Sequence, residues 1–95
     1  MNLHSLKKQR DLVLEIARTH GAYDVRVFGS ISRGEETDNS DIDLLVNFEP
    51  GRSLFDLIEL KDELEELLGI RVDIISENGL NKYMKDTVLG DAIQL

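Results

Sequence analysis

The chain has 95 residues, and 19 Asp plus Glu against 11 Lys plus Arg give a formal net charge of −8. This length predicts a single domain over residues 1–95, without a separate substrate lobe. The absence of cysteine excludes disulfides, thiolate metal sites and thiol nucleophiles. The acidic balance opposes direct binding to DNA or RNA. Because no apolar run is long enough for a membrane span or a signal peptide, a cytoplasmic protein is expected.

The first part of the chain is predicted to form a helix, a short strand and a short second helix. Apolar residues recur at helical spacing over 5–20, and Gly21 supplies a stop signal. Residues 25–28 form a short apolar run that is typical of a strand. One or two helical turns are expected over 31–37, interrupted by Gly34.

The second part of the chain predicts two more strands and two more helices. Residues 41–48 alternate with the period of two that a half-buried strand requires. Residues 53–68 repeat leucine at helical spacing and are followed by Gly69, which is a typical helix stop. Residues 70–75 are rich in β-branched side chains and predict a strand, and 80–95 predict a final helix.

This order of elements predicts an α/β (α+β) fold with a small three-stranded mixed sheet flanked by about four helices. The helix between the second and third strands is long enough for a right-handed parallel crossover. If the Gly29-Ser30 turn and the aspartates at 41 and 43 form one site, the first two strands must be antiparallel. We therefore expect one antiparallel pair and one parallel pair.

Three aspartates are candidates for a metal site. Asp41 and Asp43 lie two residues apart on a predicted strand, so their side chains leave the same face with Cα atoms about 6 to 7 Å apart. Asp73 lies near the start of the third strand, at the end where the second strand also begins. Oxygen-only ligands favour Mg²⁺ or Mn²⁺. The alternative is that these carboxylates are ordinary solvated residues at strand ends.

The turn at Gly29 and Ser30 is a candidate phosphate site, because a strand-to-helix junction offers free backbone amides and the positive end of the helix dipole. Arg33 follows in the same loop and could reach the same phosphate. The alternative for the turn is a plain helix cap, and for the arginine a solvated surface position.

These motifs together resemble the nucleotidyltransferase superfamily that includes DNA polymerase β. Gly29-Ser30 is followed after ten residues by Asp41-Ile-Asp43, and an acidic strand follows later. The chain length, Arg33-Gly34 and the run Arg71-Val-Asp-Ile-Ile75 are most similar to the minimal nucleotidyltransferase (MNT) family. The resemblance is strongest over 25–75 and looser in the terminal helices.

The resemblance implies roles for six residues. The catalytic and metal-binding carboxylates would be Asp41, Asp43 and Asp73, and the phosphate-binding residues would be Gly29, Ser30 and Arg33. The first two aspartates would hold the Mg²⁺, or Mn²⁺, that bridges the triphosphate of ATP. The third would complete the metal site and help to deprotonate the attacking hydroxyl.

The resemblance also implies a partner. MNT proteins usually act as antitoxins of HEPN-domain toxins, by transferring AMP from ATP to a tyrosine of the toxin. The alternatives are a non-catalytic antitoxin that neutralises the toxin by binding, a small-molecule nucleotidyltransferase, and an acidic structural domain without catalysis. The predicted last helix carries an apolar stripe that could contact a partner: Leu80, Met84, Val88 and Leu95.

Overall fold

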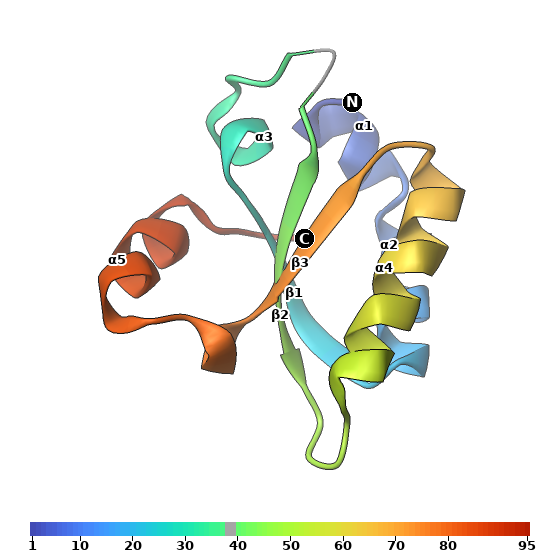
Figure 1. The fold of residues 1–95 in the computed structure, drawn as a ribbon. Helices are drawn as coiled ribbons and strands as arrows, with labels where there is room; N and C mark the ends of the chain where they lie inside the picture. The colour runs from blue at the N-terminus through green and yellow to red at the C-terminus, as the bar shows by residue number, and fades with distance from the viewer. Residues whose placement is uncertain (38–39) are drawn as a thin grey trace.

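The computed structural model of the protein describes residues 1–37 and 40–95 and has an α+β fold (Figure 1). Over these residues, helices and strands alternate along most of the chain. Their bounds are α1 Leu3–Lys8, α2 Arg10–Thr19, β1 Ala22–Phe28, α3 Ser30–Arg33, β2 Ile42–Phe48, α4 Leu54–Leu68, β3 Val72–Ser76, a 3₁₀ turn η1 at Glu77–Gly79, α5 Lys82–Asp91 and β4 Ile93–Gln94. None of these helices has the length and apolar character needed to cross a membrane.

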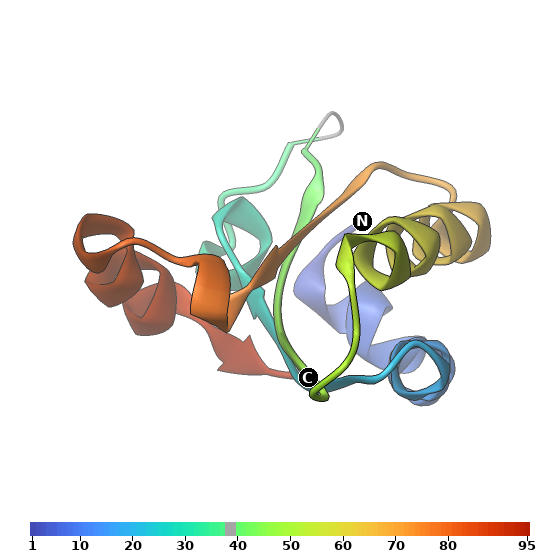
Figure 2. The same cartoon turned by 60° about the horizontal axis from the view of Figure 1, so that its bottom comes forward.

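The four strands form one mixed sheet in the order β3-β2-β1-β4. β1 is antiparallel to both β2 and β4, whereas β2 and β3 are parallel. The predicted mixed sheet, with an antiparallel first pair and a parallel second pair, is therefore confirmed. Figures 1 and 2 show α1, α2 and α4 on one side of the sheet and α3 and α5 on the other.

The main core lies between the sheet and the helices α1, α2 and α4. Every second residue of β2 points into it, and Ile42, Leu44 and Val46 are fully buried there. Helix α4 contributes a row of leucines at helical spacing on its inner side. The intervening β2 residues face the other side of the sheet, which carries α5. Leu45 is one of them and is fully buried. The alternation that predicted this strand thus separates the face covered by α1, α2 and α4 from the face that carries α3 and α5.

The single N-terminal helix predicted over 5–20 differs from the structure in its first residue and in its continuity. It starts at Leu3, because the side chain of Asn2 caps it by accepting a hydrogen bond from the Ser5 amide at 2.8 Å. It is then interrupted at Gln9, whose backbone leaves the helical region and whose amide donates to two carbonyls of α1. The predicted single helix is therefore two short ones.

The C-terminal segment corrects the predicted strand count and the predicted apolar stripe. The helix expected over 80–95 ends at Asp91, and residues 93–94 pair with β1 as a fourth strand. A two-residue strand is too short to produce a detectable alternation in the sequence. Val88 and Leu95 are almost fully buried, so the stripe does not form one exposed surface; Met84 remains 46% exposed.

The capping box at the start of α4 gives a stability prediction. The Ser53 hydroxyl accepts from the Phe55 amide at 3.2 Å, and the Asp56 carboxylate accepts from the Ser53 amide at 2.8 Å. The second bond is the main reason why the pKa of Asp56 lies below its ordinary value. We expect Ser53→Ala to lower the free energy of unfolding by about 1 kcal/mol, measured by urea denaturation. Thr19→Ala removes a helix-end hydroxyl that donates to the Ile16 carbonyl at 2.7 Å but caps no free amide, so a smaller loss is expected there. An equal loss would contradict the assignment.

Candidate functional site

Two of the three candidate aspartates lie side by side on the parallel strands β2 and β3. Asp43 of β2 and Asp73 of β3 are directly paired in register. Neighbouring strands lie about 4.8 Å apart, so these two side chains leave the sheet next to each other. They project from the face opposite the main core, because Ile42 and Leu44 on either side of Asp43 point into that core. Asp41 directly precedes β2.

Gly29 brings the backbone of β1 against the carboxylate of Asp43. Phe28, the last residue of β1, pairs with Asp43 across the antiparallel ladder, and Gly29 follows at the turn into α3. A Cβ atom at Gly29 would lie 2.4 Å from Oδ2 of Asp43. The backbone angles of Gly29, φ 78° and ψ −154°, belong to a region that glycine alone populates readily. Only glycine therefore permits this approach.

The three carboxylates carry unbalanced negative charge. The pKa of Asp43 lies above its ordinary value, mainly because partial burial disfavours the ionised form and further because Asp73 and Asp41 repel it. Arg33 opposes this shift. Among the residues described, none forms an ion pair with any of the three aspartates. A bound cation would remove this repulsion.

The structure does not bring the three carboxylates as close as bound ligands would be. Within residues 1–37 and 40–95, the only group of three or more potential metal ligands within 4.8 Å of one another is His20, Asp56 and Glu59. These lie at the end of α2 and the start of α4, where His20 also contacts Glu63 at 3.0 Å and Asp56 closes the capping box. Their atoms already have protein partners, so this group is explained by helix packing.

The start of β3, which carries Asp73, is held in place by helix α4. The Glu65 carboxylate accepts hydrogen bonds from the Val72 amide at 2.9 Å and from the Lys61 ammonium at 2.9 Å. Both bonds favour the ionised carboxylate, and the lysine contributes most to lowering the pKa of Glu65 below its ordinary value. Glu65 thus fixes the strand end one residue before Asp73.

Arg33 lies near the aspartates, but its guanidinium is already engaged. Nη1 of Arg33 is 2.6 Å from the carboxylate of Asp91 in α5, and Nε is 3.2 Å from that of Glu35. The pKa of Arg33 is raised, and the hydrogen bond to Asp91 is the largest cause. Asp91 is the residue near this site that sequence reasoning missed. It lies 58 positions from Arg33, and only the path of α5 across the second face of the sheet brings the two together.

Comparison with known proteins identifies the family of this fold. A family model described as a nucleotidyltransferase domain matches residues 6–95. The chain belongs to the nucleotidyltransferase family. This nucleotidyltransferase is 40% identical over 95 residues to the "Putative protein adenylyltransferase MJ0435" of Methanocaldococcus jannaschii, covering 100% of this chain and 99% of that one. It is 42% identical over 79 residues to the "Protein adenylyltransferase MntA" of Thermococcus cleftensis, covering 83% of this chain and 80% of that one.

Solved structures agree with this assignment. The structure of a "putative minimal nucleotidyltransferase" has a TM-score of 0.89 and 53% sequence identity, and covers 100% of this chain and 97% of that chain. The expected resemblance to minimal nucleotidyltransferases is thereby confirmed. A toxin–antitoxin structure with AMP-PNP has a TM-score of 0.77 at 23% identity, covering 88% of this chain and 69% of that chain. At that identity it supports the fold alone.

Proposed function

We propose that this nucleotidyltransferase moves AMP from ATP to a tyrosine hydroxyl of a partner protein, and that Asp41, Asp43 and Asp73 are its catalytic residues. One observation carries the proposal: Asp43 and Asp73 are paired in register on adjacent strands, with the backbone of Gly29 directly against the Asp43 carboxylate. Unpaired like charges repel each other and do not stabilise a fold. A bound cation would neutralise these charges, and a phosphate chain would use the space that the glycine leaves open.

The residues of this site fit a hard divalent cation. The donors are carboxylate oxygens, which Mg²⁺ and Mn²⁺ prefer, and the partial burial of Asp43 already disfavours its charge without a counter-ion. Asp41, Asp43 and Asp73 would hold the metal. When bound, the ion would neutralise negative charge on the triphosphate and so favour attack at the α-phosphorus.

The other residues would bind the phosphates and move one proton. The Gly29 backbone leaves room for a phosphate oxygen, and the Ser30 hydroxyl and amide lie next to it at the start of α3. Arg33 would help to bind the outer phosphates, either while it keeps its ion pair with Asp91 or by leaving Asp91 for a phosphate oxygen. The acceptor oxygen forms a bond to the α-phosphorus while the bond to the β-phosphate oxygen breaks and pyrophosphate leaves. Asp73 accepts the hydroxyl proton.

The proposed partner is a HEPN-domain toxin, for which this chain would be the antitoxin. The relatives named as protein adenylyltransferases support a protein acceptor, and the resemblance to MNT proteins supports the toxin class. The match to such a relative over 100% of this chain and 99% of that one supports the same class of acceptor. The acceptor surface would therefore come from the partner.

Radiolabelled ATP provides the test. The protein is incubated with Mg²⁺, the HEPN-type protein encoded beside it, and ATP labelled at either the α- or the γ-phosphate. We expect label on the partner only from α-labelled ATP, because pyrophosphate leaves with the γ-phosphate. Asp41→Asn with Asp43→Asn should abolish labelling, whereas the exposed pair Asp11→Asn with Glu15→Gln should not.

Two results would contradict this proposal. Transfer of the γ-label would indicate phosphorylation. Full neutralisation of the toxin by the Asp41→Asn, Asp43→Asn variant, without any label, would favour the alternative in which the antitoxin acts by binding alone.

A further inference from the structure

Helix α4 exposes large apolar side chains at its N-terminal end. Leu54 is 69% exposed, Phe55 is 75% exposed and Ile58 is 43% exposed. The core-facing leucines of the same helix are almost completely buried, so these three residues do not contribute to the core. Adjacent exposed apolar side chains of this size are a common feature of protein contact sites.

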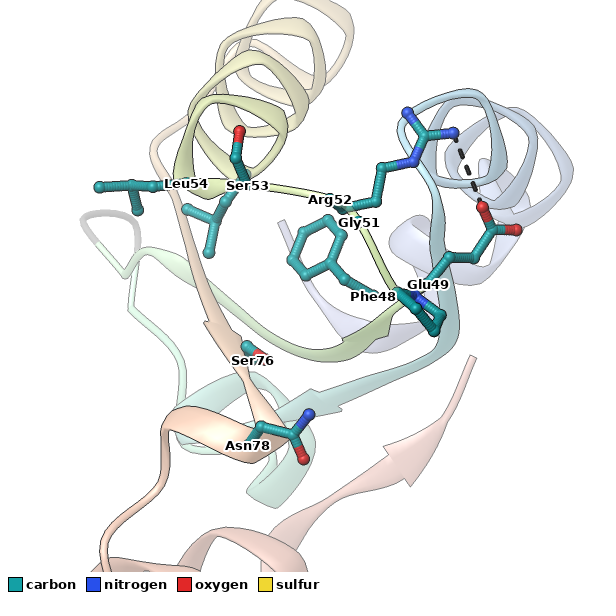
Figure 3. A pocket seen from close by; sticks show the side chains of 10 residues that line it. Phe48, Glu49, Gly51, Arg52, Ser53, Leu54, Ser76 and Asn78 are labelled. Carbon is teal, nitrogen blue, oxygen red and sulfur yellow. Dashed lines mark ion pairs between the residues drawn. The ribbon is translucent and has the colours of Figure 1, made fainter.

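One of these residues, Leu54, also lines a pocket. Figure 3 shows it between the start of α4 and the ends of β2 and β3, with Phe48 and Leu54 among its apolar walls and Ser76 and Asn78 on another side. At its rim, Arg52 pairs with Glu49 at 3.6 Å, so its charge is partly neutralised. The pocket can accept an apolar side chain next to the exposed start of α4.

The same exposed side of α4 becomes acidic towards its C-terminal end. Residues at i and i+4 lie above one another on a helix, so the row that starts at Ile58 continues with Asp62 and Glu66, both exposed. Lys61, the one basic residue of α4, is partly buried and paired with Glu65. The exposed side therefore has an apolar end and an anionic end.

We propose that this surface, the α4 face formed by Leu54, Phe55, Ile58, Asp62 and Glu66, binds a basic amphipathic helix of a partner polypeptide. The partner's apolar side chains would cover the N-terminal end of the face and enter the adjacent pocket. Its Lys and Arg side chains would lie along the acidic end. This combination of apolar anchors and complementary charge is the usual form of helix recognition.

A second copy of this chain is a less suitable occupant. Each copy carries a net charge of −8, and pairing two identical α4 faces would place each acidic end against the other acidic end or against an apolar end, without a basic partner in either case. An anionic membrane surface would be repelled for the same reason. A basic amphipathic segment complements both ends of the face, because it carries apolar side chains for one end and positive charge for the other.

The proposed contact is spatially separate from the candidate active site. Phe48, which lines the pocket, lies five residues after Asp43 on β2, and five residues of strand span about 17 Å. A partner could therefore hold the α4 face while the aspartates remain accessible. This contact does not require catalysis, because an antitoxin that acts by binding alone could use it too.

Peptide selection tests the inference with the complete protein. A random 16-residue peptide library is selected on wild type, with Leu54→Ser, Phe55→Ser protein as counter-selection, and the affinities of the selected peptides are measured by fluorescence anisotropy. We expect the enriched peptides to combine apolar residues with an excess of Lys and Arg. Loss of two apolar anchors should weaken their binding about 10-fold or more.

Two matched variants separate the apolar and the charged contributions. Asp62→Lys with Glu66→Lys should weaken binding and reduce its salt dependence. Leu12→Ser, which alters a 50% exposed apolar residue on α2, should leave binding unchanged. Enrichment of neutral or acidic peptides, or equal losses from Leu12→Ser and the α4 variant, would overturn the proposal. Sedimentation that shows a wild-type dimer broken by Phe55→Ser would overturn it in favour of a second copy.

Discussion

Replacing Asp43 by Asn is expected to slow AMP transfer strongly and to make the metal-free protein more stable. The loss of transfer should reach about 10²–10³-fold, because one ligand of the metal that would neutralise the triphosphate is removed. The gain in stability follows from burial and from repulsion by Asp73 and Asp41, which disfavour the charged carboxylate in the folded state. Thermal unfolding with EDTA at neutral pH, and the labelling assay with Mg²⁺, measure the two effects.

The stability difference should depend on pH with a defined sign. The folded pKa of Asp43 lies above its unfolded value, so the folded state retains the proton longer and wild-type stability falls as pH rises through that interval. The variant should therefore match wild type in acid and exceed it above the ordinary aspartate pKa of about 3.9. Mg²⁺ should stabilise wild type and leave the variant unchanged.

An exposed carboxylate provides the control for this prediction. Asp11 is 97% exposed, and Asp11→Asn should change neither transfer nor the response to Mg²⁺. If Asp43→Asn were less stable than wild type in EDTA at neutral pH, the carboxylate would be a structural partner of the fold and its assignment as a metal ligand would be wrong.

Gly29→Ala is expected to damage both the fold and AMP transfer. The new Cβ would lie 2.4 Å from Oδ2 of Asp43, and alanine disfavours the positive φ of 78° at this position. Backbone strain alone costs of order 1–3 kcal/mol. Relief of the contact must also move either the Asp43 side chain or the turn. AMP transfer should fall about 100-fold or more. Urea denaturation should show a loss of unfolding free energy larger than backbone strain alone would cause.

Gly34 is the matched control for this substitution. It also has a positive φ, 72°, but a Cβ there would meet nothing within 4 Å among the described atoms. Gly34→Ala should therefore cost only about 1–2 kcal/mol of backbone strain and retain most of the transfer activity. Equal effects of the two substitutions on activity would show that the contact with Asp43 has no role.

The sequence was sufficient to place the two central aspartates together. The alternation around Asp43 identifies both the strand and the face from which its side chain projects, and a long helix before Asp73 predicts a parallel neighbour. These are local signals, and the register of β2 and β3 agrees with them. The roles of the aspartates in metal binding and transfer remain predictions that the Asp43 and labelling experiments test.

Contacts between distant segments could not be predicted in this way. The pairing of Arg33 with Asp91 depends on where α5 ends, and the bond from Val72 to Glu65 depends on how α4 meets β3. Strand β4 is defined by its partner β1 rather than by any pattern of its own. Each of these features arises from tertiary packing, for which a single short segment carries no periodic signal.

The position of β1 in the sheet has a consequence for synthesis of the protein. β1 pairs on one side with β2 and on the other with β4, and the Leu95 amide donates to the Val25 carbonyl at 3.0 Å. During synthesis, one edge of β1 therefore stays unpaired until residues 93–95 have left the ribosome. Unpaired strand edges readily pair with strands of other chains. We expect the nascent chain to depend on chaperones until those residues emerge, and folding to finish only afterwards.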